Sequence, residues 1–329
     1  MKKGQDRPMN TLDLFVGAGG LSEGFSQAGF TVSAGVDFDE EKLETFQANH
    51  EGKSVCRDLF EYTPEEFESE TGIHPDEIDG IVGGPPCKGF SLAGKRDTSD
   101  ERNHLVYRFL EFVEYYNPLF IVIENVKGMV SMEDEHGDEV LPQVITAVEE
   151  LGYTVSWDVL NASYYGVPQT RERVFIVGIQ EDLDVDFEFP EPEESQTTVE
   201  DAGVFTEPLP EDDVGTNHQS STVERLEKLD VGESLYDNYS ESWKRIAGDE
   251  PAPTLKNNNN APFVHPSEPR VGTIRECARI QSFPEEYEFR GTKSKQYEIL
   301  GNAVPVELAR RLGVQVATAF DVSVNTPSE

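Results

Sequence analysis

A glycine- and proline-rich turn interrupts this 329-residue chain and limits how the segment around it can fold. The run 79–82 is typical of a short buried strand, and Gly-Gly-Pro-Pro follows it at 83–86. The two glycines allow a close backbone turn, and the two prolines fix φ and remove two backbone donors. Cys87 comes next, so we expect its thiol to be presented by a stiff turn and not packed in a core.

A cysteine attacks as its thiolate, so a nucleophilic Cys87 needs charged or proton-carrying groups nearby. The run 119–123 is typical of a second buried strand, and Glu124 and Asn125 follow it. Open parallel sheets bind ligands at the carboxyl ends of their strands. We therefore expect this carboxylate and this amide at the edge that presents the thiol.

Two arginines precede another apolar run, 174–178. Arg171 and Arg173 alternate in the sequence, so the pattern predicts that they enter a strand from the same side. Two guanidinium groups on one face can bind a polar or anionic partner through paired hydrogen bonds.

Strand-like and helix-like segments alternate along the chain, which predicts an α/β fold with a Rossmann-like, doubly wound, mostly parallel sheet. The expected strands are 11–15, 31–36, 54–58, 79–82, 119–123, 153–160 and 173–179. The expected helices are 21–28, 40–48, 103–115, 140–151 and 306–320. We expect the last helix to return to the sheet.

The first strand leads into a turn that contains Gly17, Gly19 and Gly20. Such a turn lets a ligand approach the backbone at a helix N-terminus, although a tight turn without a ligand gives the same pattern. Asp37 ends the next strand about 20 residues further on, where an acid binds ribose hydroxyls in dinucleotide folds. The two features together predict a nucleotide-binding half.

Several motifs occur in one order along the chain. They are DLFVGAGG at 13–20, Pro86-Cys87, Glu124-Asn125-Val126, Gln169-x-Arg171-x-Arg173, RVGTIRECARIQSFP at 270–284 and Gly301-Asn302-Ala303-Val304-Pro305. Together they resemble the ordered motifs of the cytosine C5 DNA methyltransferases, over about residues 11–312. The resemblance implies an enzyme that methylates C5 of a flipped cytosine in double-stranded DNA, with S-adenosylmethionine as donor.

The resemblance also implies a role for individual residues. Cys87, Glu124, Arg171 and Arg173 would be catalytic, with Cys87 bonded covalently to C6 of the base. The cofactor would be bound by Phe15, Gly17, Gly19, Gly20, Leu21, Asp37, Phe38, Asp58, Leu59, Pro85, Leu105, Asn302 and Val304. Asp37 would bind the ribose, Phe38 would stack on adenine and Asp58 would accept from its amino group. Lys88 stands where the family usually has glutamine.

The polar segment 88–102 lacks apolar periodicity, so we expect a loop that closes over the substrate. Ser91, Lys95 and Arg96 in this loop are candidate DNA contacts. Thr254 and Arg270 are further candidates, since Pro253-Thr254-Leu255 resembles a signature of the family's target recognition domain. The run 257–260, four asparagines, could read adenine edges or be a polar loop.

Periodicity fades after Gln180, and the segment to Tyr236 is rich in Pro, Glu, Asp, Ser and Thr. The family places a smaller, inserted target recognition domain in this interval. We therefore predict a catalytic, cofactor-binding domain at 1–185, a target recognition domain at 186–270, a hinge and motif region at 271–300, and a C-terminal helix at 301–329 that returns to the catalytic domain.

Other classes of protein fit the composition poorly. Three cysteines at 56, 87 and 277 form no CxxC pair, and the six histidines lack metal-ligand spacing, so we expect no disulfide framework and no metal. We expect Cys56 and Cys277 to be core residues. No run approaches the roughly 18 apolar residues of a spanning helix, which predicts a cytoplasmic protein without membrane association.

The net charge of −37 opposes binding to a polyanion. The acids are unevenly placed: segment 181–241 has 20 Asp and Glu against two basic residues, whereas 270–311 has eight basic residues against six acids. This distribution favours an acidic solvated surface around a neutral or basic cleft. We hypothesise that the protein works in a halophilic cytoplasm, where salt screens its self-repulsion.

Two other functions fit the same motifs. A tRNA cytosine C5 methyltransferase would share the catalytic residues, although the Cys-Phe-Thr signature of that branch is missing after 281–284. A catalytically inactive, DNA-binding regulatory relative is the other alternative, and the intact motifs argue against it. A cognate restriction endonuclease is a candidate partner in a restriction-modification system, and we expect a monomer. The sequence does not reveal the DNA target.

Overall fold

The computed structural model describes residues 7–86, 105–134, 137–206, 209, 213, 215–236, 243–256 and 261–322. The chain divides into two compact units. The first comprises Met1–Leu160, Glu172–Pro190 and Ala309–Glu329, and the second comprises Asn161–Arg171 and Glu191–Leu308. The second unit thus contains the segment assigned to target recognition from Glu191 on, and the whole segment assigned to the hinge.

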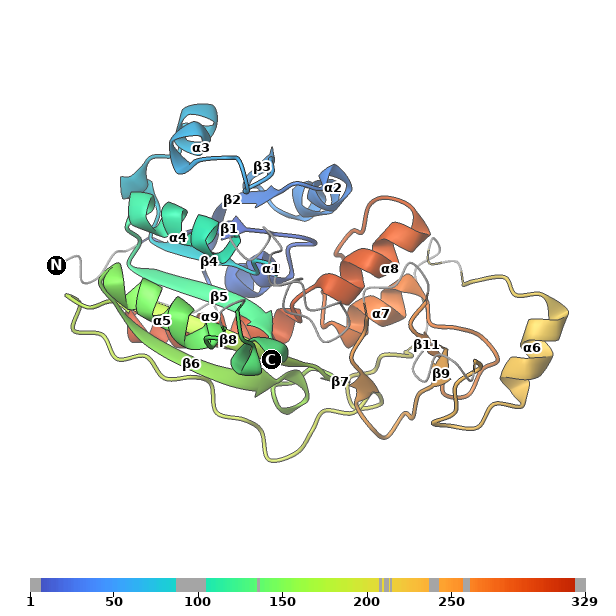
Figure 1. The fold of residues 1–329 in the computed structure, drawn as a ribbon. Coiled ribbons are helices and arrows are strands. Elements are labelled where there is room, and N and C mark those ends of the chain that lie inside the picture. The colour runs from blue at the N-terminus through green and yellow to red at the C-terminus, as the bar shows by residue number, and fades with distance from the viewer. Residues whose placement is uncertain are drawn as a thin grey trace. The chain divides into compact units, whose positions relative to one another are not determined.

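A seven-stranded sheet with the order β3-β2-β1-β4-β5-β8-β6 forms the centre of the first unit (Figure 1). Its strands are β1 (Asn10–Leu14), β2 (Thr31–Asp37), β3 (Lys53–Cys56), β4 (Gly80–Gly83), β5 (Phe120–Val126), β6 (Tyr153–Asn161) and β8 (Glu172–Gln180). The first five pair in parallel, whereas β8 runs antiparallel to β5. The predicted doubly wound, mostly parallel sheet is confirmed.

Helices cover both faces of this sheet (Figure 1). They are α1 (Gly20–Gln27), α2 (Glu40–Asn49), α3 (Pro64–Thr71), α4 (Leu105–Tyr116), α5 (Val140–Glu150) and α9 (Val306–Ala319). Apolar side chains of α3, α4 and α5 pack in one core with Leu12 and Leu14 of β1. On the other face the rings of Phe25 and Phe320 lie 6.4 and 5.9 Å from that of Phe120. The last helix therefore packs against the sheet, as expected.

The second unit is built from short elements. They are β7 (Gln169–Thr170), β9 (Lys244–Arg245), β10 (Ala252–Pro253), β11 (Phe263–Val264), α6 (Ser220–Glu227), α7 (Ile274–Ile280) and α8 (Lys293–Asn302). β7 pairs with β10, and β9 pairs with β11, both in parallel. Sequence periodicity gave no sign of α6, α7 or α8, because short helices with few apolar residues show little of it.

Some local predictions were wrong. β3 ends at Cys56, so Asp58 follows the strand, and the exposed Cys56 lies on this edge strand and not in the core. Cys277 is buried, as expected. Arg171 lies between β7 and β8 and not in a strand, so the two arginines do not share one strand face. Among the described helices, none is long and apolar enough to cross a membrane.

Candidate active site

The polar residues predicted for the site follow or end parallel strands of the first unit. Because β1 to β5 all run in the same direction, their carboxyl ends lie at one edge of the sheet. This edge carries the turn after β1, Asp37 at the end of β2, Gly84 after β4 and Glu124 near the end of β5. The fold thus brings residues from distant parts of the sequence to one edge.

The turn after β1 has an unusual backbone conformation. Phe15, Gly17 and Gly19 have φ angles of +64°, +56° and +80°, which glycine adopts readily and phenylalanine rarely. The amide of Gly17 donates to Oδ2 of Asp37 over 3.0 Å. A Cβ atom added at Gly17 would meet only the carbonyl oxygen of Phe15, at 4.0 Å, so the turn leaves room for a ligand beside its backbone.

The residues after β2 combine an anchored carboxylate with an exposed ring. Asp37 is buried, and its Oδ1 accepts from the amide of Asp39 and lies 3.6 Å from Nζ of Lys42. Phe38 is 65% exposed, and Nζ of Lys42 lies 5.2 Å from the centre of its ring. An exposed phenylalanine beside a fixed carboxylate suits a nucleoside, which offers a flat base and ribose hydroxyls.

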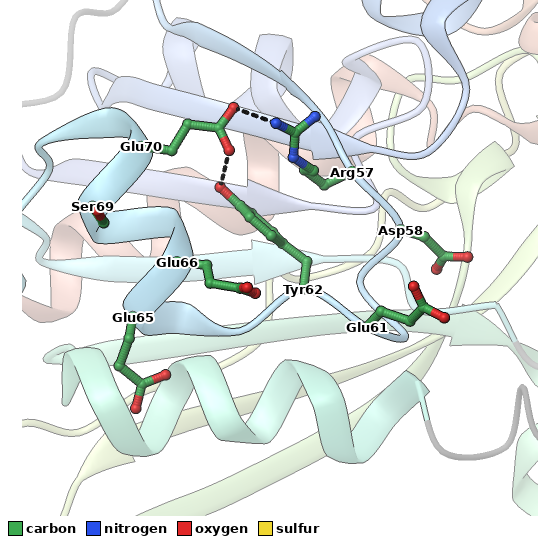
Figure 2. A pocket seen from close by; sticks show the side chains of 8 residues that line it. All are labelled: Arg57, Asp58, Glu61, Tyr62, Glu65, Glu66, Ser69 and Glu70. Carbon is green, nitrogen blue, oxygen red and sulfur yellow. Dashed lines mark hydrogen bonds and ion pairs between the residues drawn. The ribbon is translucent and has the colours of Figure 1, made fainter.

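Asp58 lies at an open pocket of about 660 Å³ (Figure 2). Its Oδ1 accepts from the amide of Phe60 over 3.0 Å, which fixes the carboxylate in a tight turn. The lining residues are Arg57, Asp58, Glu61, Tyr62, Glu65, Glu66, Ser69 and Glu70. Most are acidic, so the pocket favours groups that donate hydrogen bonds, such as an exocyclic amine.

Glu70 connects α3 to the chain on either side of Asp58. Its Oε1 accepts from Arg57 over 3.0 Å and its Oε2 accepts from the hydroxyl of Tyr62 over 2.9 Å, as Figure 2 shows. Burial, together with the neighbouring Glu70, raises the pKa of Tyr62, so this hydroxyl stays a donor at neutral pH. The helix α3, which is not among the helices expected from the sequence, thus supports the Asp58 turn.

Four predicted cofactor residues of the first unit are apolar and buried: Leu21, Leu59, Pro85 and Leu105. Because these side chains are buried, they can contact a ligand only through the few atoms that border the binding site. Phe15, by contrast, is half-buried.

Glu124 and Arg173 form the central ion pair of this edge. Nε of Arg173 lies 2.9 Å from Oε1 of Glu124, and the two side chains are 14% and 13% exposed. In the β5–β8 register Val126 lies opposite Arg173 and Phe175 lies opposite Glu124, so the ion pair is diagonal across the two strands. A carboxylate and a guanidinium group at this spacing offer adjacent acceptors and donors to one planar ligand.

The same strand holds the glycine-proline turn. Nδ2 of Asn125 donates to the carbonyl of Pro85 over 3.1 Å. A Cβ atom on Gly84 would lie 2.9 Å from Oε2 of Glu124, so glycine permits the close approach of turn and carboxylate. Glu124 and Asn125 therefore lie within a paired strand, β5, and contact the turn that immediately precedes Cys87. Cys87 itself is outside the described residues.

Arg171 lies in the second unit and is 1% exposed. Its Nη1 donates to the carbonyl of Leu255 over 3.0 Å, and its Nη2 donates to that of Gly301 over 3.1 Å. The hydroxyl of Thr254 donates to the carbonyl of Thr170. Arg171 thus holds together two motif segments, the one at Thr254 and the one that contains the exposed Asn302 and the half-buried Val304.

Arg270 makes two intramolecular ion pairs. Its Nη2 lies 2.7 Å from Oε1 of the buried Glu276, and its Nε lies 2.6 Å from Oε2 of Glu268. The hydrogen bonds to Glu276 and Glu268 raise the pKa of the Arg270 guanidinium group above its ordinary value. The other candidate DNA contacts, Ser91, Lys95 and Arg96, are outside the described residues, as are Lys88 and the asparagines 257–260.

Sequence reasoning missed Asp13, Ser22 and His50, which contact the glycine turn or its flanks. Oγ of Ser22 donates to Oδ2 of Asp13 over 2.6 Å. The signal was present, since Asp13 is a charged residue within the apolar run 12–16. Burying a carboxylate costs free energy unless hydrogen bonds or an ion pair compensate it. A buried aspartate in a strand therefore indicates a specific structural or functional role.

A parallel sheet with a glycine turn, an anchored acid and an exposed ring at one edge defines an α/β enzyme that binds a nucleoside cofactor. Comparisons with known proteins identify the family. Residues 9–318 match the family described as C-5 cytosine-specific DNA methylase. The chain belongs to this family, so it is a DNA (cytosine-5-)-methyltransferase that uses S-adenosylmethionine as its methyl donor.

Individual relatives agree with the family match. The chain is 36% identical over 330 residues to the type II methyltransferase M.FnuDI of Fusobacterium nucleatum, covering 92% of each chain. It is 32% identical over 375 residues to M.DdeI of Desulfomicrobium norvegicum, covering 95% of this chain and 89% of that one. A structure of a putative prophage-encoded DNA modification methyltransferase from E. coli is 27% identical, with a TM-score of 0.81 over 95% of this chain and 99% of that one.

The exposure of Phe38 allows its proposed role to be separated from a role in folding. Phe38→Ala should leave the melting temperature nearly unchanged, because surface substitutions usually shift stability by less than about 0.5 kcal/mol. It should weaken binding of S-adenosylhomocysteine by about 1–3 kcal/mol if the ring stacks on adenine. Calorimetry measures both. Trp157→Ala, at a ring that is 43% exposed on β6, is the control and should leave binding unchanged.

Proposed function

We propose that Glu124 and Arg173 bind the polar edge of a flipped cytosine while Cys87 adds to its C6 atom. The observation that carries the proposal is the 2.9 Å ion pair between Glu124 and Arg173, next to the turn that leads to Cys87. Cytosine presents N4, N3 and O2 along one edge. Glu124 would bind N4 and N3, and Arg173 would bind O2.

The chemistry follows from the poor nucleophilicity of C5. The Cys87 thiolate forms a bond to C6, and the electron pair of the C5–C6 double bond moves into the ring toward N3 and O2, where Glu124 and Arg173 stabilise it. S-adenosylmethionine, when bound, would supply an electrophilic methyl group to C5 and would leave as S-adenosylhomocysteine. A base then removes the C5 proton, the bond from Cys87 to C6 breaks, and the thiolate leaves as 5-methylcytosine forms.

The cofactor residues of the first unit fit this donor. The space beside Gly17 allows a ligand to approach the turn, and the exposed Phe38 with Asp37 suits an adenosine. In our proposal Phe15, Gly17, Gly19, Gly20 and Leu21 bind the methionine part. Asp58, Leu59, Pro85 and Leu105 border the adenine, and Asn302 and Val304 are further proposed cofactor contacts.

The target carbon is inaccessible inside a duplex, so the base must be extruded at a cost of a few kcal/mol. We propose that Arg171 supports the flipped state indirectly, through the backbone of Leu255 and Gly301. Ser91, Lys95, Arg96, Thr254 and Arg270 are the proposed DNA contacts. For Arg270 this requires sharing the guanidinium group with Glu268 and Glu276.

The relatives are named type II methyltransferases, which supports a place in a restriction-modification system. We propose that the chain acts as a cytoplasmic monomer on double-stranded DNA and protects it from a cognate restriction endonuclease. The proposed domain at 186–270 would select the target. Mass spectrometry of 5-methylcytosine in the DNA and tRNA of an expression host tests the substrate. Finding 5-methylcytosine in tRNA alone would contradict DNA methylation.

Cys87→Ala should abolish methyl transfer but retain S-adenosylmethionine binding, because the sulfur acts on the base. DNA that contains 5-fluorocytosine cannot lose a C5 proton, so the wild-type protein should form a stable covalent adduct, detectable by denaturing electrophoresis. Cys56→Ala, at the exposed cysteine, is the control and should still form the adduct. An adduct with Cys87→Ala would rule out the assignment.

Glu124→Gln should lower turnover by on the order of 10²–10³, because the carboxylate stabilises charge that develops in the transition state. DNA affinity should change little. Single-turnover kinetics and DNA binding measure the two quantities. Glu172→Gln, which alters a surface ion pair with Lys127, should retain normal turnover. A Glu124→Gln variant that keeps more than about half of the wild-type turnover would contradict the proposed role.

The charge of −37 predicts an unusual response to salt. At about 1 M salt the Debye length falls to about 3 Å, which screens self-repulsion and the repulsion of DNA while affecting close, desolvated contacts less. If the protein is halophilic, melting temperature and methylation should both rise along a KCl series. A methylation maximum below about 0.2 M, without a gain in melting temperature, would contradict the halophilic hypothesis, since counterion release then dominates.

A further inference from the structure

A buried carboxylate lies beneath the glycine turn. Asp13 is in β1, an interior strand of the sheet, and is 1% exposed. Its neighbours Leu12 and Leu14 belong to the apolar core on one face of the sheet, so its side chain points to the other face. Burying a carboxylate in such a position is costly unless hydrogen bonds compensate it.

Asp13 makes these hydrogen bonds to the start of α1. The hydroxyl of Ser22 donates to its Oδ2 over 2.6 Å, and the backbone of Ser22 also hydrogen-bonds to the carboxylate. Ser22 is the third residue of α1, and the N-cap residue, Gly19, makes no side-chain cap. Asp13 therefore supplies from β1 the acceptor that a capping side chain usually supplies.

The Asp13–Ser22 contact joins the two ends of the turn. Residues 15–19 leave β1 and return to α1, and Phe15 and Gly19 both have positive φ angles. Two further contacts hold the middle and the end of the turn: Gly17 donates to Asp37, and His50 hydrogen-bonds to the backbone of Gly19. A non-glycine residue in this conformation costs of order 1–3 kcal/mol, so the turn needs such anchors to keep its shape.

We propose that Asp13 is a positioning residue for the methyl donor, which acts through Ser22 to fix the start of α1 and thereby the shape of the glycine turn. This inference rests on the proposed cofactor site, because binding the cofactor is what would require the turn to keep a strained conformation. Asp13 is buried beneath the backbone and acts on the cofactor only through the turn and through its charge.

The charge of Asp13 adds a dependence on pH. Burial raises the pKa of its carboxyl group to about 7, the Ser22 hydrogen bonds lower it, and the nearby Asp37 raises it. Asp37 is itself beside Lys42, and Glu23 of α1 lies 3.9 Å from His50, whose pKa burial lowers to about 4. In α9, Gly313 packs against Ala28 and against Phe25 of α1. His50 therefore stays neutral while Asp13 titrates.

The way cofactor affinity depends on pH follows from the role of the Asp13 carboxylate as a hydrogen-bond acceptor. Above pH 7 the ionised carboxylate accepts both Ser22 hydrogen bonds, and its negative charge would favour a cationic group of the cofactor. Below pH 7 the protonated group accepts more weakly. Cofactor affinity should therefore fall as the pH decreases from 8 to 6. Folding stability has the opposite sign: because the folded pKa lies above the model value of 3.8, stability is lost as the pH rises from about 4 to about 7.

Two substitutions and a control test the proposal. Asp13→Asn keeps the shape and removes the charge, and Ser22→Ala removes one donor. Thr11→Val is the control, because Thr11 is equally buried in β1 but its hydroxyl faces the carbonyl of Thr31, 3.4 Å away. We would measure S-adenosylhomocysteine binding by calorimetry at pH 6, 7 and 8, the KM values for S-adenosylmethionine and for DNA, and the melting temperature.

Asp13→Asn should weaken S-adenosylhomocysteine binding at pH 8 by about tenfold, as expected for a hydrogen bond to a charged group. It should raise the KM for S-adenosylmethionine, leave the KM for DNA unchanged and flatten the pH dependence of binding. Ser22→Ala should shift the same quantities less, and it decides the question if Asp13→Asn does not fold. Thr11→Val should bind like the wild type.

Wild-type affinity and pH dependence in both variants would overturn the proposal, as would a parallel rise of both KM values. These failures differ from a failure of the proposed cofactor site. If the wild-type protein binds no S-adenosylhomocysteine, the cofactor site itself is wrong, and the positioning role falls with it.

Discussion

The antiparallel pairing of β8 with β5 is the contact on which the candidate catalytic centre depends. β1 to β5 run in parallel and would bring only their own carboxyl ends to the edge. Because β8 enters at this edge in the opposite direction, it begins there, and its second residue, Arg173, meets Glu124. The same strand, β5, holds Pro85 through Asn125. One pairing thus brings a carboxylate, a guanidinium group and the turn before Cys87 together.

The sequence predicted this edge better than it predicted the details of its residues. Buried strands are long and apolar, and glycine and proline end them sharply, so the sheet could be derived from periodicity and turn chemistry. The sequence did not indicate that β5 continues through Glu124 and Asn125, because that extension depends on pairing with β8, about 50 residues further along the chain. Arg171 and Arg173 look equivalent in the sequence, yet one binds backbone carbonyls and the other a carboxylate.

The glycine turn shows a balance between stability and binding. Phe15 adopts a strained backbone angle, and Asp13 is buried where its ionised form is disfavoured. Neither feature helps the chain to fold, and an apolar residue at 13 would suit the strand better. Both features make sense if the turn must keep a shape that leaves its backbone accessible. The sequence shows this conflict directly, as an aspartate within an apolar run, and such local conflicts are expected at functional sites.

The second unit is held together in a different way from the first. Its described strands have two residues each, so ladder hydrogen bonds contribute little. Arginines replace them: the buried Arg245 donates to the carbonyls of Leu226, Leu229, His265, Pro266 and Glu268, and Arg279 donates to those of Val204 and Thr206.

These arginines bind carbonyl groups inside the unit, so they cannot serve equally as contacts to phosphate. A chain with 27 basic residues and 64 acids has few others to offer DNA. Buried bonds to carbonyls are screened little by salt, whereas repulsion between surface carboxylates is screened strongly. High salt would therefore preserve the internal bonds of this unit while removing the repulsion that opposes its approach to DNA.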